Sequence, residues 1–171
     1  MRKIFISILL SLVAIEASAQ QSPLSLGGEG DIVIVAQTAT YKGQETFLEG
    51  QVDVKQGEAQ ILSDRMKIIR DKGNSSATGE VELGAMSRIE AHGNFVYETP
   101  ENRITGDTGI YVRRTGVITV TGDVKVVQPQ GNTATTDKLI YNVSTESIEF
   151  VGNCSGNSCT DRPTLRLNSK E

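Results

Sequence analysis

The chain has 171 residues, with 17 basic and 21 acidic side chains and one histidine, and a net charge of −4. That length suffices for one domain with a hydrophobic core. The acidic balance, without a basic patch interleaved with aromatic residues, argues against nucleic acid as a partner.

The first 19 residues have the form of a secretory signal peptide. Two basic residues precede an apolar run at 4–15, and Ala17-Ser18-Ala19 fits a signal-peptidase site, so cleavage after Ala19 is expected. The apolar run is short for a membrane span. The alternative is a buried N-terminal helix. Residues 20–30, rich in Gly, Ser and Gln, are expected to be a flexible lead-in.

Residues 31–152 repeat a unit of one strand and one turn. In Val117–Val127 the apolar Ile118, Val120, Val124 and Val126 alternate with polar residues around Gly122, the pattern of a half-buried strand. A marker residue of this kind stands in the middle of each predicted strand, about every 14 or 15 residues: Gly50, Asp64, Gly79, Gly93, Asp107, Gly122, Asp137 and Gly152. The sequence therefore predicts an all-β fold of long antiparallel strands, and no helix.

The strands with an Asp marker show a slip in this alternation. In the last of them, apolar residues lie three positions before Asp137, at Ala134, and two and four positions after it, at Leu139 and Tyr141. A β-bulge at the marker explains the change from an odd to an even step, and it would turn each Asp to solvent. The Gly markers are expected to be bends. The first strand carries Gln37 in place of Asp.

An apolar face with no helix to cover it must be covered by the sheet itself, which predicts a folded-over sheet. The alternation places twelve residues on the inward face: Ile32, Ile34, Leu48, Val52, Ile61, Met66, Ile68, Phe95, Ile118, Val120, Leu139 and Tyr141. Two arrangements stay open. A tightly closed fold would be a dry sandwich core, whereas diverging halves would leave an apolar trough suited to acyl chains. The outer strands are unpaired edges, which favours end-to-end pairing with similar sheets.

Cys154 and Cys159 are the only cysteines and follow the last predicted strand. In an exported protein they are expected to form a disulfide, and so short a loop contributes about 2 kcal/mol. The alternative is a redox or metal pair, but with His92 alone the C-x4-C spacing lacks a full ligand set. Residues 153–171 are predicted to form this loop and then a mobile tail.

No constellation in the sequence is typical of catalysis. His92 is the single histidine. The alternation assigns Asp64, Asp107 and Asp137 to separate bulges rather than to a carboxylate cluster. The motifs G-x-S-x-G and H-E-x-x-H and a phosphate-binding glycine loop are missing. We therefore expect no catalytic residue, no metal site and no cofactor, and an enzyme is the third-ranked interpretation.

Two runs in this repeat carry a family resemblance. TFLEGQVDVKQGEAQILSDRMKI (46–68) and VITVTGDVKVVQPQGNTATTDKLIY (117–141) each join an apolar-x-G-x-V-x-V strand to a following D-x-apolar-x-apolar strand. They resemble the OstA-like domain of the periplasmic lipopolysaccharide-transport protein LptA family. The opening IVIVAQTATY (32–41) is similar to the first strand of that family. The resemblance covers residues 31–152.

The resemblance implies a folded-over β-jellyroll in the periplasm, with the acyl chains of lipid A against the twelve inward residues. It also implies head-to-tail stacking of copies and a bridge between an inner-membrane complex and an outer-membrane translocon that carry related domains. The family supplies no catalytic residue. Two alternatives remain open: a membrane-anchored partner in the same pathway, which Ala17-Ser18-Ala19 argues against, and a purely structural secreted β-repeat protein with a dry core.

Overall fold

The computed structural model describes residues 31–72, 85–155 and 158–168, and every element in these ranges is a β-strand. The predicted signal peptide and lead-in lie outside the described residues, as does the predicted marker Gly79. The strands are β1 (Ile32–Val35), β2 (Thr38–Lys42), β3 (Glu45–Gln56), β4 (Ala59–Arg70), β5 (Met86–Glu98), β6 (Arg103–Val112), β7 (Val117–Val127), β8 (Thr133–Asn142), β9 (Ser147–Val151), β10 (Asn153–Ser155), β11 (Ser158–Asp161) and β12 (Thr164–Arg166). The described residues contain no helix that could span a membrane.

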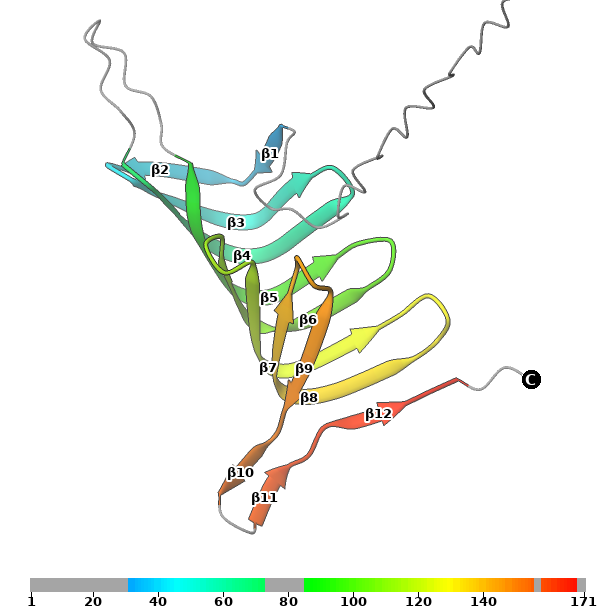
Figure 1. The fold of residues 1–171 in the computed structure, drawn as a ribbon. Helices are drawn as coiled ribbons and strands as arrows, with labels where there is room; N and C mark the ends of the chain where they lie inside the picture. The colour runs from blue at the N-terminus through cyan, green and yellow to red at the C-terminus, as the bar shows by residue number, and fades with distance from the viewer. Residues whose placement is uncertain (1–30, 73–84, 156–157, 169–171) are drawn as a thin grey trace, which may run out of the picture.

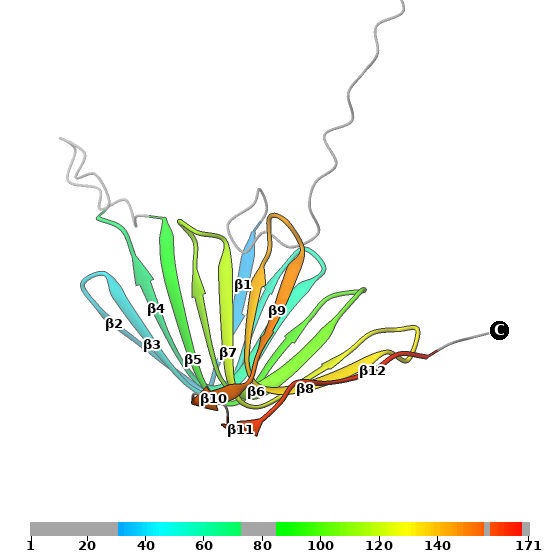
Figure 2. The same cartoon turned by 60° about the horizontal axis from the view of Figure 1, so that its bottom comes forward.

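Ten of these strands form one antiparallel sheet in which chain neighbours pair, in the order β3 to β8. Each long strand is one pass across the sheet. The first pass is split into β1 and β2, which both pair with β3, and the last pass is split into β9 and β12, which both pair with β8. The long strands bend near their middle, so that the sheet folds over on itself (Figures 1 and 2). The predicted folded-over β-jellyroll is confirmed.

The bends coincide with the predicted markers. Between β7 and β8 the register shifts so that Gly122 and Asp123 stand opposite Asp137 alone. The slip in alternation occurs on the Asp strand, as expected, since Ala134 and Leu139 are both buried. The sequence predicts the bulge on the strand with the Asp marker. In the structure the extra residue lies instead on the strand with the Gly marker. Corresponding shifts occur at Gly50 and Gly93.

Glycine is required at these bends because its φ is positive there. Gly122 has φ 80° and the following Asp123 has φ 43°, a left-handed conformation that costs a residue with a Cβ about 1–2 kcal/mol. The Asp107 carboxylate of the preceding strand lies directly over Gly122, where any side chain would collide with it. The Asp107 side chain is exposed to solvent, as predicted. It also covers the bend of β7.

The end of the chain differs from the predicted mobile tail. After β9 it leaves the sheet as the separate hairpin β10–β11, which projects away from the sheet, and returns as β12 to pair with the first half of β8 (Figure 1). In the hairpin, Cys154 pairs in register with Cys159, and Cys159 is disulfide-bonded. Because β12 pairs with β8, the sheet extends to Arg166. A three-residue strand carries too little pattern to be found by alternation.

Candidate functional site

The inward face of the sheet includes three rows of side chains that cross the whole sheet, and these rows follow from the register. The Ala39 row runs through residues paired on successive strands: Ala39, Leu48, Met66, Ala91, Gly109, Val120, Leu139 and Phe150. The Tyr41 row lies beside it: Tyr41, Thr46, Ile68, Ile89, Tyr111, Ile118, Tyr141 and Ile148. The Ile34 row lies beyond the bend: Ile34, Val54, Ile61, Tyr97, Ile104, Val126, Ala134 and Leu165. Each row crosses the whole sheet.

The structure places ten of the twelve predicted inward residues in one buried apolar core, each at most 2% exposed. Ile34 is half-buried and packs against the core, while Ile32 is 37% exposed because it stands on an outer strand. Thr121 and Lys125, of opposite parity, are exposed. The alternation therefore assigned the faces correctly.

Several core residues were missing from the predicted set, although the same counting from the markers reaches them. Ala91 lies two residues before Gly93, and Tyr97 four residues after it. The others outside the twelve are as follows: Val54, Ala59, Met86, Ile89, Ile104, Tyr111, Val124, Val126, Ala134 and Val143. Position 109 in the Ala39 row requires glycine, because the Phe95 ring lies over it and would collide with any side chain. Phe95 thereby fills the gap that this glycine leaves in the row.

The two halves of the folded sheet face each other through side chains alone. The strand order is an open path from β1 and β2 to β9 and β12, and within the described residues no ladder joins one half to the other across the interior. Separating the halves therefore breaks no backbone hydrogen bond of the sheet. At both ends of the path the inner rows reach the surface, where Tyr41 is 66% and Leu165 is 55% exposed.

Tyr97 carries an unpaired polar group in this interior. Its side chain is fully buried against Tyr141, with ring centroids 6.1 Å apart, and its hydroxyl has no hydrogen-bond partner. Burial raises the pKa of Tyr97 and raises that of Tyr141 to about 12, so both hydroxyls stay protonated. An unpaired buried hydroxyl costs about 1–3 kcal/mol. A ligand with an acceptor oxygen would remove that cost.

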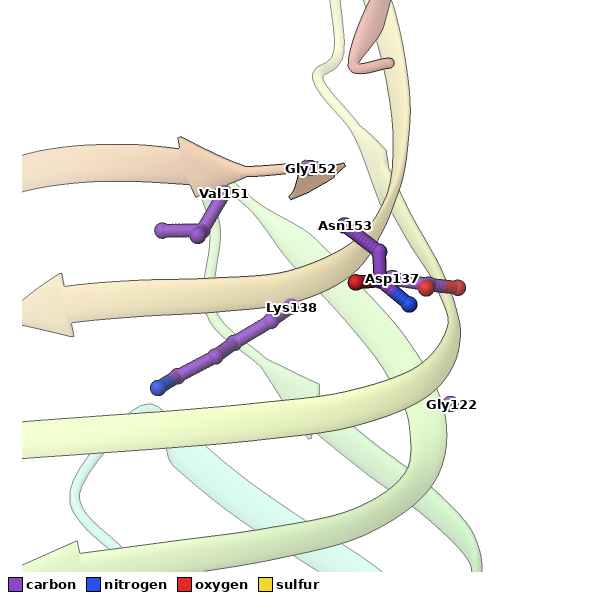
Figure 3. A pocket seen from close by; sticks show the side chains of 6 residues that line it. All are labelled: Gly122, Asp137, Lys138, Val151, Gly152 and Asn153. Atoms are coloured by element: carbon purple, nitrogen blue, oxygen red, sulfur yellow. The ribbon is translucent and has the colours of Figure 1, made fainter. Parts of the chain in front are cut away.

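A hollow of about 400 Å³ lies beside the bend of β8 and is lined by residues of β7, β8 and β9 and of the start of the hairpin (Figure 3): Gly122, Asp137, Lys138, Val151, Gly152 and Asn153. The Asp161 carboxylate raises the pKa of Asp137, and Asp123 adds a smaller effect. Among the described residues no group of His, Cys, Asp or Glu could hold a metal ion. His92 is exposed on β5.

The fold and the inward face define the class of the protein, an open antiparallel β-jellyroll built around an apolar interior. The family model described as LptA/(LptD N-terminal domain) LPS transport protein matches residues 32–147. This match covers more than half of the chain, which therefore belongs to this family of lipopolysaccharide-transport proteins.

Among solved structures, the chain is similar to LptH of Pseudomonas aeruginosa, described as the LptA-homologous periplasmic component of the lipopolysaccharide transport device. The two chains are 19% identical, with a TM-score of 0.66, and the match covers 82% of this chain and 96% of LptH. At this identity the likeness establishes the fold. No curated protein matches the sequence.

Proposed function

We propose that this protein carries lipopolysaccharide across the periplasm, with the acyl chains of lipid A held between the two halves of the folded sheet. The observation that carries the proposal is the continuity of the three apolar rows from one edge of the sheet to the other. Membership of this family of lipopolysaccharide-transport proteins supports lipopolysaccharide as the ligand. The twelve predicted inward residues are the proposed lipid contacts.

The inner side chains are buried in one continuous core, so entry of lipid requires the halves to part. Parting exposes apolar surface at about 25 cal/mol per Å², but acyl chains cover the same surface again, and the ladder hydrogen bonds stay intact. The exchange of apolar protein contacts for apolar lipid contacts is therefore close to balanced. The ester and amide oxygens of lipid A would also supply an acceptor for the unpaired Tyr97 hydroxyl.

The open edges of the sheet support a second proposal, which concerns the stacking of copies. Val33 and Val35 on β1, Tyr41 on β2, and Leu165 and the following Leu167 at β12 are exposed large apolar residues on the edge strands. Edge strands of this kind are templates for pairing with another sheet. We propose that copies stack head to tail and that related domains of the inner-membrane complex and the outer-membrane translocon extend the stack.

Photocrosslinking tests the lipid site directly. A photoreactive residue at position 120 should crosslink to lipopolysaccharide in cells that make it, because Val120 lies in the Ala39 row. The same residue at position 121 should give little product, because Thr121 faces solvent. Products are detected by immunoblotting for lipopolysaccharide on the purified protein.

Equal crosslinking at the two positions would contradict the proposed site. No product at either position, combined with purified protein free of lipid, would favour a structural β-repeat protein with a dry core. A membrane-anchored partner would keep residues 1–19 and fractionate with membranes.

We also propose that the chain is exported and cleaved after Ala19. The mature protein in the periplasmic fraction should begin at Gln20 and carry a bond between Cys154 and Cys159. Intact mass under non-reducing conditions checks both points, since the disulfide lowers the mass by about two hydrogens. Retention of residues 1–19 or two alkylatable thiols would contradict the expectation.

A further inference from the structure

Three tyrosines lie inside the apolar interior, close to the turns that end the strands. Tyr97 is the last residue but one of β5, and Tyr141 is the last residue but one of β8. Tyr111 holds the same position in β6. All three side chains are buried, whereas Tyr41, the fourth tyrosine of the chain, is 66% exposed on an edge strand. The interior therefore contains a cluster of phenol groups at the depth of the strand ends.

This tyrosine cluster joins the two halves of the folded sheet. Tyr97 belongs to the Ile34 row beyond the bend, whereas Tyr111 and Tyr141 belong to the Tyr41 row. Successive turns alternate between the two margins of the sheet, so the turn after β5 and the turn after β8 lie on opposite margins (Figure 2). The rings of Tyr97 and Tyr141, with centroids 6.1 Å apart, meet across the interior. Their contact therefore bridges the two margins.

The turns beside the cluster are acidic. Glu101 stands in the turn after β5, and Glu146 in the turn after β8. Burial raises the pKa of Tyr141 to about 12, and the carboxylates of Glu146 and then Glu101 add to this effect. Burial also raises the pKa of Tyr97, and Glu101 is among the smaller causes. The hydroxyls are therefore protonated donors, and the two nearby negative charges favour a neutral acceptor over a carboxylate or a phosphate.

The Tyr97 hydroxyl is the one buried side-chain oxygen without a hydrogen-bond partner in the described part of the chain. Other buried hydroxyls, those of Ser63, Thr99 and Thr136, donate to backbone carbonyl oxygens. A phenylalanine at position 97 would fill nearly the same volume and leave no unpaired group. The hydroxyl therefore destabilises the lipid-free protein, and it becomes favourable only in a state that supplies an acceptor.

We propose that the Tyr97 hydroxyl donates a hydrogen bond to a neutral oxygen near the carbonyl end of a bound acyl chain: an ester, amide or hydroxyl oxygen. This inference rests on the proposed binding of lipid and adds a selection to it, for acyl chains with such an oxygen over plain hydrocarbon chains. Apolar contacts alone do not fix how far a chain enters, because they are not directional. The hydroxyl fixes the depth by holding this oxygen at the level of the strand ends.

Tyr97→Phe tests the hydroxyl, and Tyr41→Phe is the control because it makes the same chemical change at an exposed tyrosine. Without lipid, Tyr97→Phe should have a higher midpoint of urea denaturation than wild type, because the unpaired group is gone. Its affinity for purified lipopolysaccharide should be about tenfold lower, which corresponds to about 1.4 kcal/mol. Poorer packing would lower both quantities, so the opposite signs identify a hydroxyl that acts in the bound state. Tyr41→Phe should change neither quantity.

Two small probes show which part of the ligand the hydroxyl recognises. Methyl dodecanoate carries an ester, and tetradecane is a hydrocarbon of the same chain length; both are added from a cyclodextrin carrier. Tyr97→Phe should bind the ester about tenfold more weakly than wild type and the hydrocarbon equally well. The C=O stretch of the bound ester should lie at lower frequency in wild type than in Tyr97→Phe, because a hydrogen bond weakens the carbonyl bond.

Equal affinity of wild type and Tyr97→Phe for lipopolysaccharide and for the ester would overturn the role of Tyr97, as would a lower denaturation midpoint of the variant. An equal loss of affinity for both probes would also overturn it, because altered packing gives that result. None of these outcomes touches the crosslinking of lipopolysaccharide at position 120. A wild-type protein that neither crosslinks there nor binds lipopolysaccharide in solution would overturn the proposed function, and this inference with it.

Discussion

Val120→Asp is expected to lower lipopolysaccharide binding by at least an order of magnitude, whereas Thr121→Asp should leave it close to that of wild type. Val120 is fully buried in the Ala39 row between Gly109 and Leu139. A carboxylate at this position must be desolvated against acyl chains, at a cost of several kcal/mol. At position 121 the carboxylate stays in water. Binding to purified lipopolysaccharide measures the difference.

A second pair of variants is needed because a charge at position 120 also destabilises the core of the lipid-free protein. Phe150→Asp alters the half-buried end of the same row, and Glu149→Asp is its outward control. Circular dichroism and a denaturant melt establish that each variant is folded before binding is measured. Wild-type affinity in folded Val120→Asp and Phe150→Asp proteins would exclude the inner face as the lipid site.

Gly122→Val is expected to destabilise the fold by about 2–4 kcal/mol. The left-handed φ of 80° disfavours a β-branched residue, and the new side chain would collide with the Asp107 carboxylate. Because ladder pairing resumes on both sides of the bend at Thr121 and Val124, the backbone cannot relax without breaking pairs. Urea denaturation should show a lower midpoint for Gly122→Val.

Two variants separate the causes of this loss. Thr121→Val, next to the bend and exposed, should change the free energy of unfolding by less than about 0.5 kcal/mol. Adding Asp107→Ala to Gly122→Val removes the collision and should recover part of the loss, while the strain of the positive φ remains. A Gly122→Val protein as stable as wild type would show that the bend does not depend on glycine.

The alternation of side chains was sufficient to predict which residues face inward. Ile118, Val120, Leu139 and Tyr141 were assigned correctly because period-2 alternation depends only on the pleat of the strand. The slip around Asp137 was also visible. What the sequence did not reveal was the strand that carries the extra residue, because a bulge is a relation between two strands and the alternation describes each strand alone.

The alternation of side chains also could not predict the closed packing of the interior or the return of β12 to the sheet. The alternation is the same for a dry core and an open trough, since both bury one face, so the two arrangements had to stay open. Thr164 to Arg166 follow a hairpin with no repeat marker, and their pairing with β8 is decided by tertiary contacts such as the two hydrogen bonds from Asn168 to Asn132 and Gln130.

Passes with a Gly marker (β3, β5 and β7) alternate with passes with an Asp marker (β4, β6 and β8), and this alternation sets how such a chain can grow. A Gly pass and an Asp pass run in opposite directions, so the natural increment is a hairpin of two passes, about 29 residues here from Gly93 to Gly122. Duplication of one hairpin lengthens the molecule and preserves two complementary ends. Gain or loss of a single pass would leave two ends of the same kind that run in the same direction, and such a chain would terminate a stack instead of extending it.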